Sequence, residues 1–305
     1  MKQSDQVPVI LHIPKNAGTY MERMLQLFFT EHWRDKRSRK SGIMNVRRVE
    51  VCDQTVKMIV FCVMIDDYFL TDPHMQNSFD KSHLMLSMCS IDTFRQYITN
   101  GNAKILTILV KPSTTNDLRV SWFTAWDLLK TIKVSPINQM FLRDTFSRQQ
   151  SLYNYITSDE SSHELTHGKI KHETFEQYLT SDQLEDSWLI RGLTNMPIET
   201  IITQRWVDLT LDFIHDNNIM VHDVKLVDNI LHETYNACFN KSFSNLVNDR
   251  KNINELQQTD KQYSNISARK KIKYTDLPPE IQNIFDQRTK WDQKLYKHLT
   301  STKLS

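Results

Sequence analysis

The chain has 305 residues, which is long enough for one α/β domain to bury a large hydrophobic core. Its 38 lysines and arginines nearly balance its 36 aspartates and glutamates, and the net charge of +2 excludes a protein whose main role is to coat nucleic acid. The four cysteines include no C-x-x-C pair, so they predict neither a disulfide framework nor a cysteine zinc site. We expect buried thiols in a reducing compartment.

The first predicted element is a buried strand at 7–13, where VPVILHI is a continuous apolar run rich in β-branched side chains. A tight turn with Lys15 and Gly18 follows, and the next residues, TYMERMLQLFF, carry apolar side chains at helical spacing. The chain contains only five glycines, so we expect Gly18 to meet a demand of the backbone. The order is strand, phosphate-sized loop and helix.

Basic residues crowd the next segment, 33–48, whose seven arginines and lysines predict either a solvated loop or the rim of a site for an anionic substrate. Apolar runs predict further strands at 56–65 and 104–110. Helical patterns dominate the remainder of the chain, at residues 116–131, 137–157, 173–194, 198–217, 223–237 and 278–299.

Strands early and helices late predict one α/β domain over 1–305 with a helix-rich C-terminal half. A polar stretch at about 240–273 predicts a long loop or insert. No segment approaches the roughly 20 apolar residues of a membrane span, and the short apolar run near the N-terminus is unlike a signal peptide. We therefore expect a cytoplasmic protein without a membrane span.

The loop after the first strand favours an anion on chemical grounds. The N-terminus of a helix presents free backbone N–H groups and the positive end of its dipole, and Lys15 adds a point charge. The pattern lacks G-x-x-x-x-G-K-[ST], so a Walker A site for ATP is not expected. On these residues alone, a turn without a ligand is equally open.

Residues 11–25, LHIPKNAGTYMERML, resemble the H-I-P-K-T-G/A-G-T-S loop of the membrane-type carbohydrate sulfotransferases, the group containing the heparan sulfate 2-O- and 6-O-sulfotransferases. The resemblance implies a P-loop-NTPase-like three-layer fold with a central parallel sheet. It also implies that the loop wraps the phosphosulfate of 3′-phosphoadenosine 5′-phosphosulfate (PAPS). The residues implied as ligands are Lys15, Asn16, Ala17, Gly18, Thr19 and Tyr20. Asn16 stands where threonine is usual, and Tyr20 where serine is usual.

Further segments resemble the family in the same order along the chain. Residues 82–113 are similar to the G-H-x-x-x-S segment and the strand ending in L-R-D-P, and DLRVSWFTAWDLL is similar to the R-x-x-S-x-Y-Y helix. Residues 172–195 and 274–299 resemble the T-F-E-E-F-L segment and the family's usual ending. One departure stands out: the L-R-D-P arginine, a ligand of the 3′-phosphate, falls on Val110.

The resemblance assigns roles to single residues. Lys15 is implied to stabilise the leaving group, and His83, preceded by Ser82 where glycine is usual, to act as the base, with a structural histidine as the alternative. Ser121, helped by Lys111 or Arg119, is implied to bind the 3′-phosphate. The residues implied to line the cleft or close over the adenosine end are Arg191, Arg269, Lys270 and Lys271.

We therefore predict a sulfotransferase that moves a sulfuryl group from PAPS to a hydroxyl of a carbohydrate acceptor, without a metal ion and without a nucleic-acid partner. Two alternatives remain open. The first is an inactive relative that keeps a nucleotide or glycan site, because of Val110. The second is a zinc hydrolase using the H-E-x-x-H pattern of His163, Glu164 and His167, although Gly168 follows at once and no apolar helix carries the pair.

Overall fold

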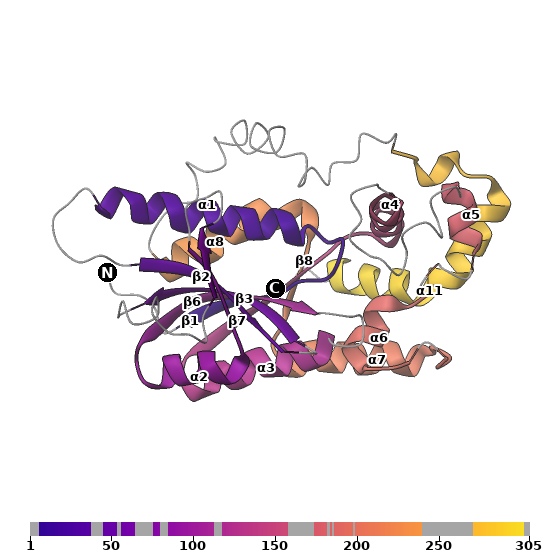
Figure 1. The fold of residues 1–305 in the computed structure, drawn as a ribbon. Helices are drawn as coiled ribbons and strands as arrows, with labels where there is room; N and C mark the ends of the chain where they lie inside the picture. The colour runs from indigo at the N-terminus through magenta and orange to yellow at the C-terminus, as the bar shows by residue number, and fades with distance from the viewer. Residues whose placement is uncertain are drawn as a thin grey trace.

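An eight-stranded mixed sheet lies at the centre of the computed structural model, with helices on both faces (Figure 1). Its strand order is β4-β5-β2-β3-β6-β1-β7-β8. The residues that the structure describes are 6–37, 45–53, 56–64, 76–79, 85–112, 118–157, 174–181, 184, 186–197, 199–239 and 271–301.

The strands are β1 (Gln6–Leu11), β2 (Asn45–Cys52), β3 (Val56–Met64), β4 (Gln76–Phe79), β5 (Met85–Cys89), β6 (Ala103–Pro112), β7 (Ser135–Leu142) and β8 (Met220–Asp223). The α-helices are α1 (Gly18–Arg37), α2 (Ile91–Thr99), α3 (Leu118–Thr131), α4 (Thr145–Ile156), α5 (Phe175–Thr180), α6 (Trp188–Thr194), α7 (Gln204–Asp216), α8 (Val227–Phe239) and α11 (Pro279–Ser301). Short 3₁₀ turns are η3 (Val224–Leu226) and η4 (Tyr274–Asp276).

The strands β6, β1, β7 and β8 run parallel to one another, and β1 lies between β6 and β7. On the other side of β6, β3 is antiparallel to both β6 and β2. The predicted α/β architecture is thus confirmed. The prediction of a parallel sheet holds from β6 to β8 and for the pair of β2 and β5, and it is wrong at β3 and β4, which run antiparallel to their neighbours. The carboxyl ends of β6, β1 and β7 meet at one edge, where α/β proteins commonly bind ligands.

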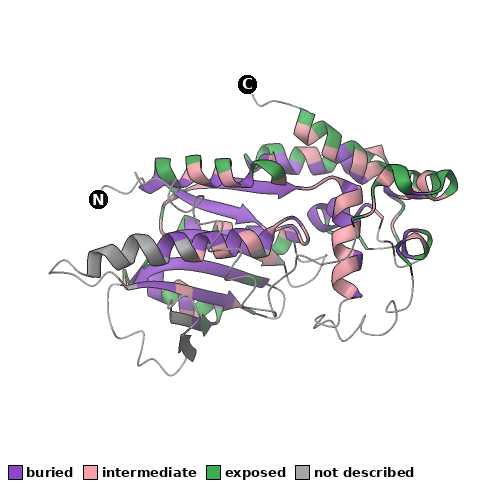
Figure 2. Ribbon diagram, turned by 90° about the horizontal axis from the view of Figure 1, so that it is seen from above, coloured by how far each residue is buried: buried purple, intermediate pink, exposed green. Residues whose placement is uncertain are grey.

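Strand β1 is a continuous apolar run because its successive side chains enter two different hydrophobic cores, one on each face of the sheet. Val9 and Leu11 join the core beneath α2, α3 and α7, while Ile10 joins the core beneath α1 and α8. Both faces of the strand are therefore covered, as Figure 1 shows for the sheet as a whole and Figure 2 shows by the burial of its strands. The strands predicted at 7–13, 56–65 and 104–110 correspond to β1, β3 and β6.

The helix predicted at 137–157 is wrong over its first third, because Ser135–Leu142 is strand β7. Two polar side chains, Asn138 and Gln139, interrupt the apolar pattern by which a buried strand is recognised in a sequence. Asn138 Nδ2 donates to the Asn217 carbonyl at 2.7 Å, and Gln139 Nε2 donates to Thr234 Oγ1 at 2.6 Å. These long-range partners satisfy the two buried amide nitrogens, whereas Oδ1 of Asn138 and Oε1 of Gln139 have no hydrogen-bond partner among the described residues.

The helix predicted at 173–194 is two helices, α5 and α6, because Ser187 adopts a left-handed conformation with φ of 51° just before α6. Asp292 of α11 accepts backbone hydrogen bonds from Trp188 and Ile190, so it caps α6 from a distant part of the chain. Burial raises the pKa of Asp292 to about 6, although Arg148 nearby opposes the shift.

Other predicted boundaries shift by smaller amounts. The helices predicted at 116–131 and 278–299 correspond to α3 and α11, and those at 198–217 and 223–237 correspond to α7 and α8. The solvated loop predicted at 33–48 is wrong at both ends, because α1 continues to Arg37 and β2 begins at Asn45. Of the polar stretch at 240–273, only 271–273 belong to the described residues.

The C-terminal half is rich in helices, as predicted, and α4, α5 and α11 build a separate apolar cluster beside the β7 and β8 side of the sheet. Phe175, Tyr178 and Phe285 are buried there, with Tyr153 of α4 packed against the first two rings. The four cysteines form no disulfide; three of them are buried and Cys52 is partly buried. The cluster fixes α4 next to the carboxyl end of β7.

Candidate anion-binding site

The loop between β1 and α1 has an unusual backbone. Lys15 and Ala17 adopt left-handed conformations with φ of 66° and 62°, at a cost of about 1 kcal/mol each. The side chain of Asn16 between them is buried, and its Oδ1 accepts the backbone N–H of Arg143 at 3.2 Å. The loop is therefore tied to the end of β7 and held in a shape that aims its residues at the carboxyl edge of the sheet.

The demand that Gly18 meets is one of space and not of backbone conformation, because its φ is not in the left-handed region and a side chain lies close to its Cα. A Cβ built on Gly18 would overlap the imidazole of His12. Nδ1 of His12 is buried and has no hydrogen-bond partner among the described residues. Burial and the nearby Lys111 lower the pKa of His12 to about 3, despite an opposing effect of Glu22. His12 is therefore neutral near pH 7 and a weak base.

Lys15 is partly buried and lies over an aromatic ring, its Nζ 3.2 Å from the centre of Tyr155 of α4. Burial, together with the positive charge of Arg143, lowers the pKa of Lys15 to about 7. A negatively charged ligand would favour the ammonium form and raise this pKa. Lys15 is thus a cation whose charge responds to what binds beside it.

Arg143 stands at the carboxyl end of β7 and is also partly buried, which lowers its pKa although Asp144 and Asp223 oppose the shift. Both carboxylates are engaged elsewhere. Asp144 caps α4 by accepting the Ser147 N–H at 2.9 Å, and Asp223 accepts the Tyr296 hydroxyl at 2.6 Å. Within the described part of the chain, no carboxylate lies within ion-pair distance of the Arg143 guanidinium.

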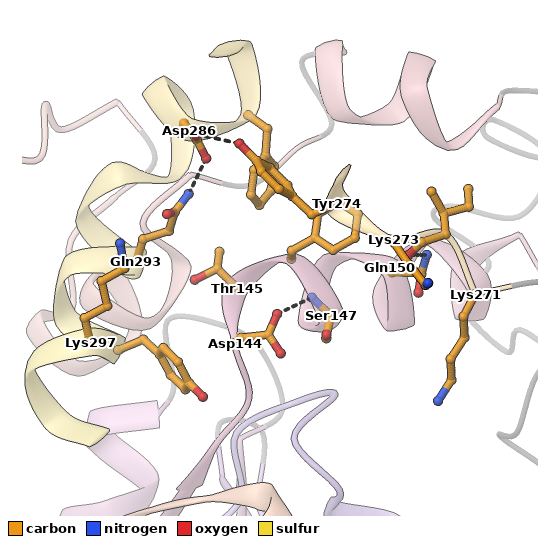
Figure 3. Close-up of a pocket in the computed structure, with 14 residues that line it drawn as sticks. Asp144, Thr145, Ser147, Gln150, Lys271, Lys273, Tyr274, Asp286, Gln293 and Lys297 are labelled. Carbon is orange, nitrogen blue, oxygen red and sulfur yellow. Dashed lines mark hydrogen bonds between the residues drawn. The ribbon is translucent and has the colours of Figure 1, made fainter. Parts of the chain in front are cut away.

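A cavity of about 770 Å³ opens beside α4, between the first turn of that helix, residues 271–274 and α11 (Figure 3). Asp144, the residue after Arg143, is one of the residues that line it. Its aromatic wall consists of Phe146, Tyr274, Phe285 and Tyr296, and its basic residues are Lys271, Lys273 and Lys297. The volume is in the range of pockets for nucleotides and other small molecules.

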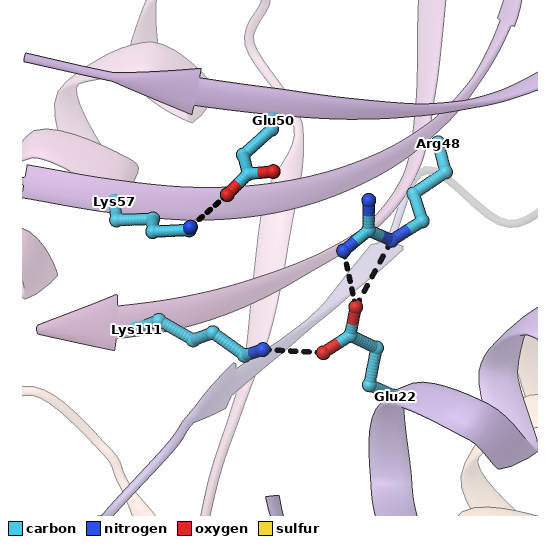
Figure 4. A network of polar contacts seen from close by, with 5 residues as sticks. All are labelled: Glu22, Arg48, Glu50, Lys57 and Lys111. Carbon is cyan, nitrogen blue, oxygen red and sulfur yellow. Dashed lines mark hydrogen bonds and ion pairs between the residues drawn. The ribbon is translucent and has the colours of Figure 1, made fainter. Parts of the chain in front are cut away.

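On the opposite side of β1, Glu22 of α1 joins two cations from different strands (Figure 4). Its Oε1 accepts the Nε of Arg48 in β2 at 3.0 Å as well as an Nη, and its Oε2 pairs with Lys111 of β6. Burial alone would raise the pKa of Glu22, but Lys111 and Arg48 outweigh it and lower the pKa. Lys111 therefore already has a carboxylate partner.

The residues predicted to read the 3′-phosphate are not brought together. Val110 is buried in the core beneath α3, and Lys111, one residue further along the strand, points to the opposite face, toward α1. Ser121 lies in the first turn of α3, fully buried, and its Oγ has no partner among the described residues. The guanidinium of Arg119 lies 5.3 Å from the centre of the Phe213 ring, packed between α3 and α7.

Of three other predicted ligands, two are hydrogen-bonded to other groups of the protein and one lines the cavity beside α4. Arg191 is buried, and its guanidinium donates to Asp186 Oδ1 at 2.9 Å and to the Pro197 carbonyl at 2.6 Å. The hydroxyl of Tyr20 is bonded to Asp228 of α8. Lys271 lines the cavity beside α4.

Several predicted residues lie outside what the structure describes. These are His83, Arg269, Lys270, the side chain of Thr19, and the His163, Glu164 and His167 pattern. Within the described ranges, no group of three histidine, cysteine or acidic side chains has the arrangement to hold a metal ion.

Arg143 and Tyr155 are the site residues that sequence reasoning missed. Both belong to the segment predicted as one helix, 137–157, where a strand end next to the loop was not foreseen. The dipeptide Arg143-Asp144 after the apolar run MFL was the available signal, because polar residues at the carboxyl end of a buried strand often line a site.

Comparisons with protein-family models, with curated proteins and with solved structures found no match to this chain. No helix in the described ranges is both long enough and apolar enough to cross a membrane. The assignment of a function therefore rests on the residues of the loop, the resemblance that they carry and the geometry around them.

Proposed function

We propose that the chain is a sulfotransferase that moves a sulfuryl group from PAPS to a hydroxyl of a saccharide. One observation carries this proposal: a loop with the Pro-Lys-Asn-Ala-Gly sequence ends at the N-terminus of α1, on the edge of the parallel half of the sheet. The Arg143 backbone is bonded to this loop, and the Arg143 charge lowers the pKa of Lys15. Backbone N–H groups at a helix N-terminus and two cations suit a phosphosulfate.

The surrounding residues fit the two ends of such a nucleotide. The loop offers charge to the 5′ end, and the cavity beside α4, which Asp144 lines, offers aromatic rings and Lys271 to the adenosine end. PAPS, when bound, supplies the sulfuryl group and a phosphate leaving group. Lys15 stabilises the negative charge that develops on that phosphate, because its ammonium form is favoured when an anion lies next to it.

The acceptor hydroxyl has to lose its proton during transfer. His12 is poorly suited to accept it, because its pKa of about 3 makes it a weak base. His83 stays the proposed base, on the resemblance alone. Loss of the His83 imidazole is expected to lower turnover and leave nucleotide affinity unchanged.

A second candidate function is an inactive nucleotide- or glycan-binding protein. The placement of Val110 and Lys111 favours it, because neither side chain is free to hold a 3′-phosphate at the end of β6. A zinc hydrolase is the third candidate, and metal analysis of the purified protein would test it.

The test is a calorimetric comparison of 3′-phosphoadenosine 5′-phosphate (PAP), AMP and ATP, followed by an assay of labelled sulfuryl transfer from PAPS to a panel of saccharides. If the protein reads the 3′-phosphate, charge-assisted hydrogen bonds favour PAP over AMP by about tenfold or more. Binding of PAP without transfer to any saccharide favours the second candidate. Equal affinity for PAP and AMP contradicts the PAPS-dependent function.

A further inference from the structure

Two cationic residues from different elements lie at the loop after β1, and within the described part of the chain no carboxylate forms an ion pair with either of them. Lys15 comes from the loop and Arg143 from the end of β7, and the backbone N–H of Arg143 is bonded to Asn16 inside the same loop. Like charges brought together in a partly buried place repel each other unless an anion joins them. Their convergence therefore points to a ligand that carries negative charge.

The acidic neighbours do not account for the Arg143 charge by direct contact. Asp144 is occupied as the N-cap of α4, and Asp223 is held by the Tyr296 hydroxyl and by the Lys225 N–H at 2.8 Å. The aromatic ring of Tyr155 underlies Lys15 and limits where an anion approaches. An anion that contacts Lys15 and the loop is left with Arg143 as its second cationic neighbour among the described residues.

We propose that Arg143 is a second binding residue of the anion site and that its guanidinium and the ammonium of Lys15 hold one phosphate group between them. This inference rests on the proposed function, in which that group is the 5′-phosphate of the nucleotide. A guanidinium presents paired N–H donors that match two oxygens of a phosphate, whereas an ammonium acts as a point charge. Arg143 therefore adds orientation as well as affinity, and the next residue, Asp144, lines the cavity beside α4.

The experiment measures the affinity of PAP and, separately, of inorganic pyrophosphate for the unmutated protein, Arg143→Ala, Arg143→Gln and the control Arg205→Ala, by calorimetry. Arg205 is an exposed arginine of α7. We expect both Arg143 variants to bind PAP at least tenfold more weakly, because a charge-assisted bond is lost, and Arg205→Ala to bind it normally. Arg143→Gln carries the test if Arg143→Ala does not fold.

A second readout tests whether the two charges lie close enough to affect each other. Loss of the Arg143 charge removes a neighbour that lowers the pKa of Lys15, so the pH above which pyrophosphate affinity declines should move upward in Arg143→Gln. An unmoved midpoint would show that the Arg143 charge does not reach Lys15 and would contradict the inference.

The outcomes distinguish this inference from the proposed function. Unchanged PAP affinity in both Arg143 variants overturns the inference and leaves the sulfotransferase proposal intact. If PAP does not bind but pyrophosphate does, and its binding depends on Arg143, the anion site stands and the sulfotransferase proposal fails. If neither ligand binds the unmutated protein, both are wrong.

Discussion

The cations on the two sides of the carboxyl end of β1 differ in whether they pair with a carboxylate. On the β6 side, the carboxylate of Glu22 contacts Arg48 and Lys111 together. On the β7 side, the positive charge of Arg143 lowers the pKa of Lys15, and neither residue forms an ion pair with a carboxylate in the described part of the chain. Positive charge alone therefore does not mark a binding site. Cations that share a carboxylate hold the fold together, and cations left without one are available to a ligand.

The largest effect expected from this contrast is that of Lys15→Ala. Removing the cation that stabilises the leaving group should lower transfer by about 10³-fold and weaken PAP binding. The melting temperature should not fall, because a desolvated amine next to Arg143 contributes little to stability. Transfer assays and thermal melts check both statements.

Lys133→Ala provides a matched control for Lys15→Ala. Lys133 is an exposed lysine whose φ of 55° places it in the same left-handed region, so the backbone cost of alanine is alike at the two positions. Normal transfer by Lys15→Ala would show that the loop does not hold the reacting phosphate.

Glu22→Gln should have the opposite profile, losing stability and keeping ligand binding. Breaking this partly buried network leaves Arg48 and Lys111 without their carboxylate and should cost about 3 kcal/mol in urea unfolding at pH 7. The exposed pair of Asp127 and Lys130 serves as control, and Asp127→Asn should cost no more than about 0.5 kcal/mol.

The effect of Glu22→Gln depends on pH in a defined direction. The folded state lowers the pKa of Glu22, so its contribution is fully present above the pKa of the unfolded chain and is lost as the pH falls through the folded value. The two proteins should converge in stability in acid. A loss of pyrophosphate affinity at pH 7 that equals the loss in Lys15→Ala would contradict the division between the two sides.

Gly18→Ala should disturb the packing between the loop after β1 and His12, because the added Cβ overlaps the ring of His12. We expect a loss of about 2 kcal/mol in stability from overpacking and weaker PAP binding. The double variant His12→Ala/Gly18→Ala should recover much of both, which a double-mutant cycle measures. Gly101→Ala is the control, since its φ of 77° brings strain but no atom lies within 4 Å.

The smallest effect is a pH dependence of binding. With a pKa of about 7 in the free protein, Lys15 is mostly neutral at pH 8, and an anion that favours the ammonium takes up a proton on binding. PAP affinity should therefore fall about tenfold per unit between pH 8 and 9. Lys15→Arg, which stays charged, should flatten the profile. A flat profile for the unmutated protein would mean that Lys15 does not contact the anion.

Local sequence was enough to predict the elements that have strong local signals. β1 and β3 are continuous apolar runs, and α11 keeps its apolar side chains at helical spacing over its whole length. Strand β7 has no such signal, because Asn138 and Gln139 look like surface residues until α7 and α8 supply their hydrogen-bond partners. Boundaries set by distant residues could not be predicted from local sequence either; one example is the start of α6, which is capped by Asp292.

The residues of the candidate site likewise divide into those with a local sequence signal and those brought there by long-range contacts. Lys15 and Gly18 belong to one short motif, so a single segment predicted their neighbourhood. Arg143 comes close to Lys15 only because β7 pairs with β1, a contact across more than a hundred residues of sequence. The alternation of side chains along β6 likewise decides that Lys111 faces away from the side of Val110, which spacing in the sequence does not reveal.

The buried amide of Asn16 has a consequence for the speed of binding. Its bond to the Arg143 N–H fixes the loop to β7, and the Asn16 N–H is itself held by the Ile13 carbonyl at 3.0 Å. Little conformational entropy is then lost when an anion arrives, and no loop closure has to precede capture. Association should follow a single fast phase whose rate falls with added salt, because diffusion and the attraction of the two cations control it.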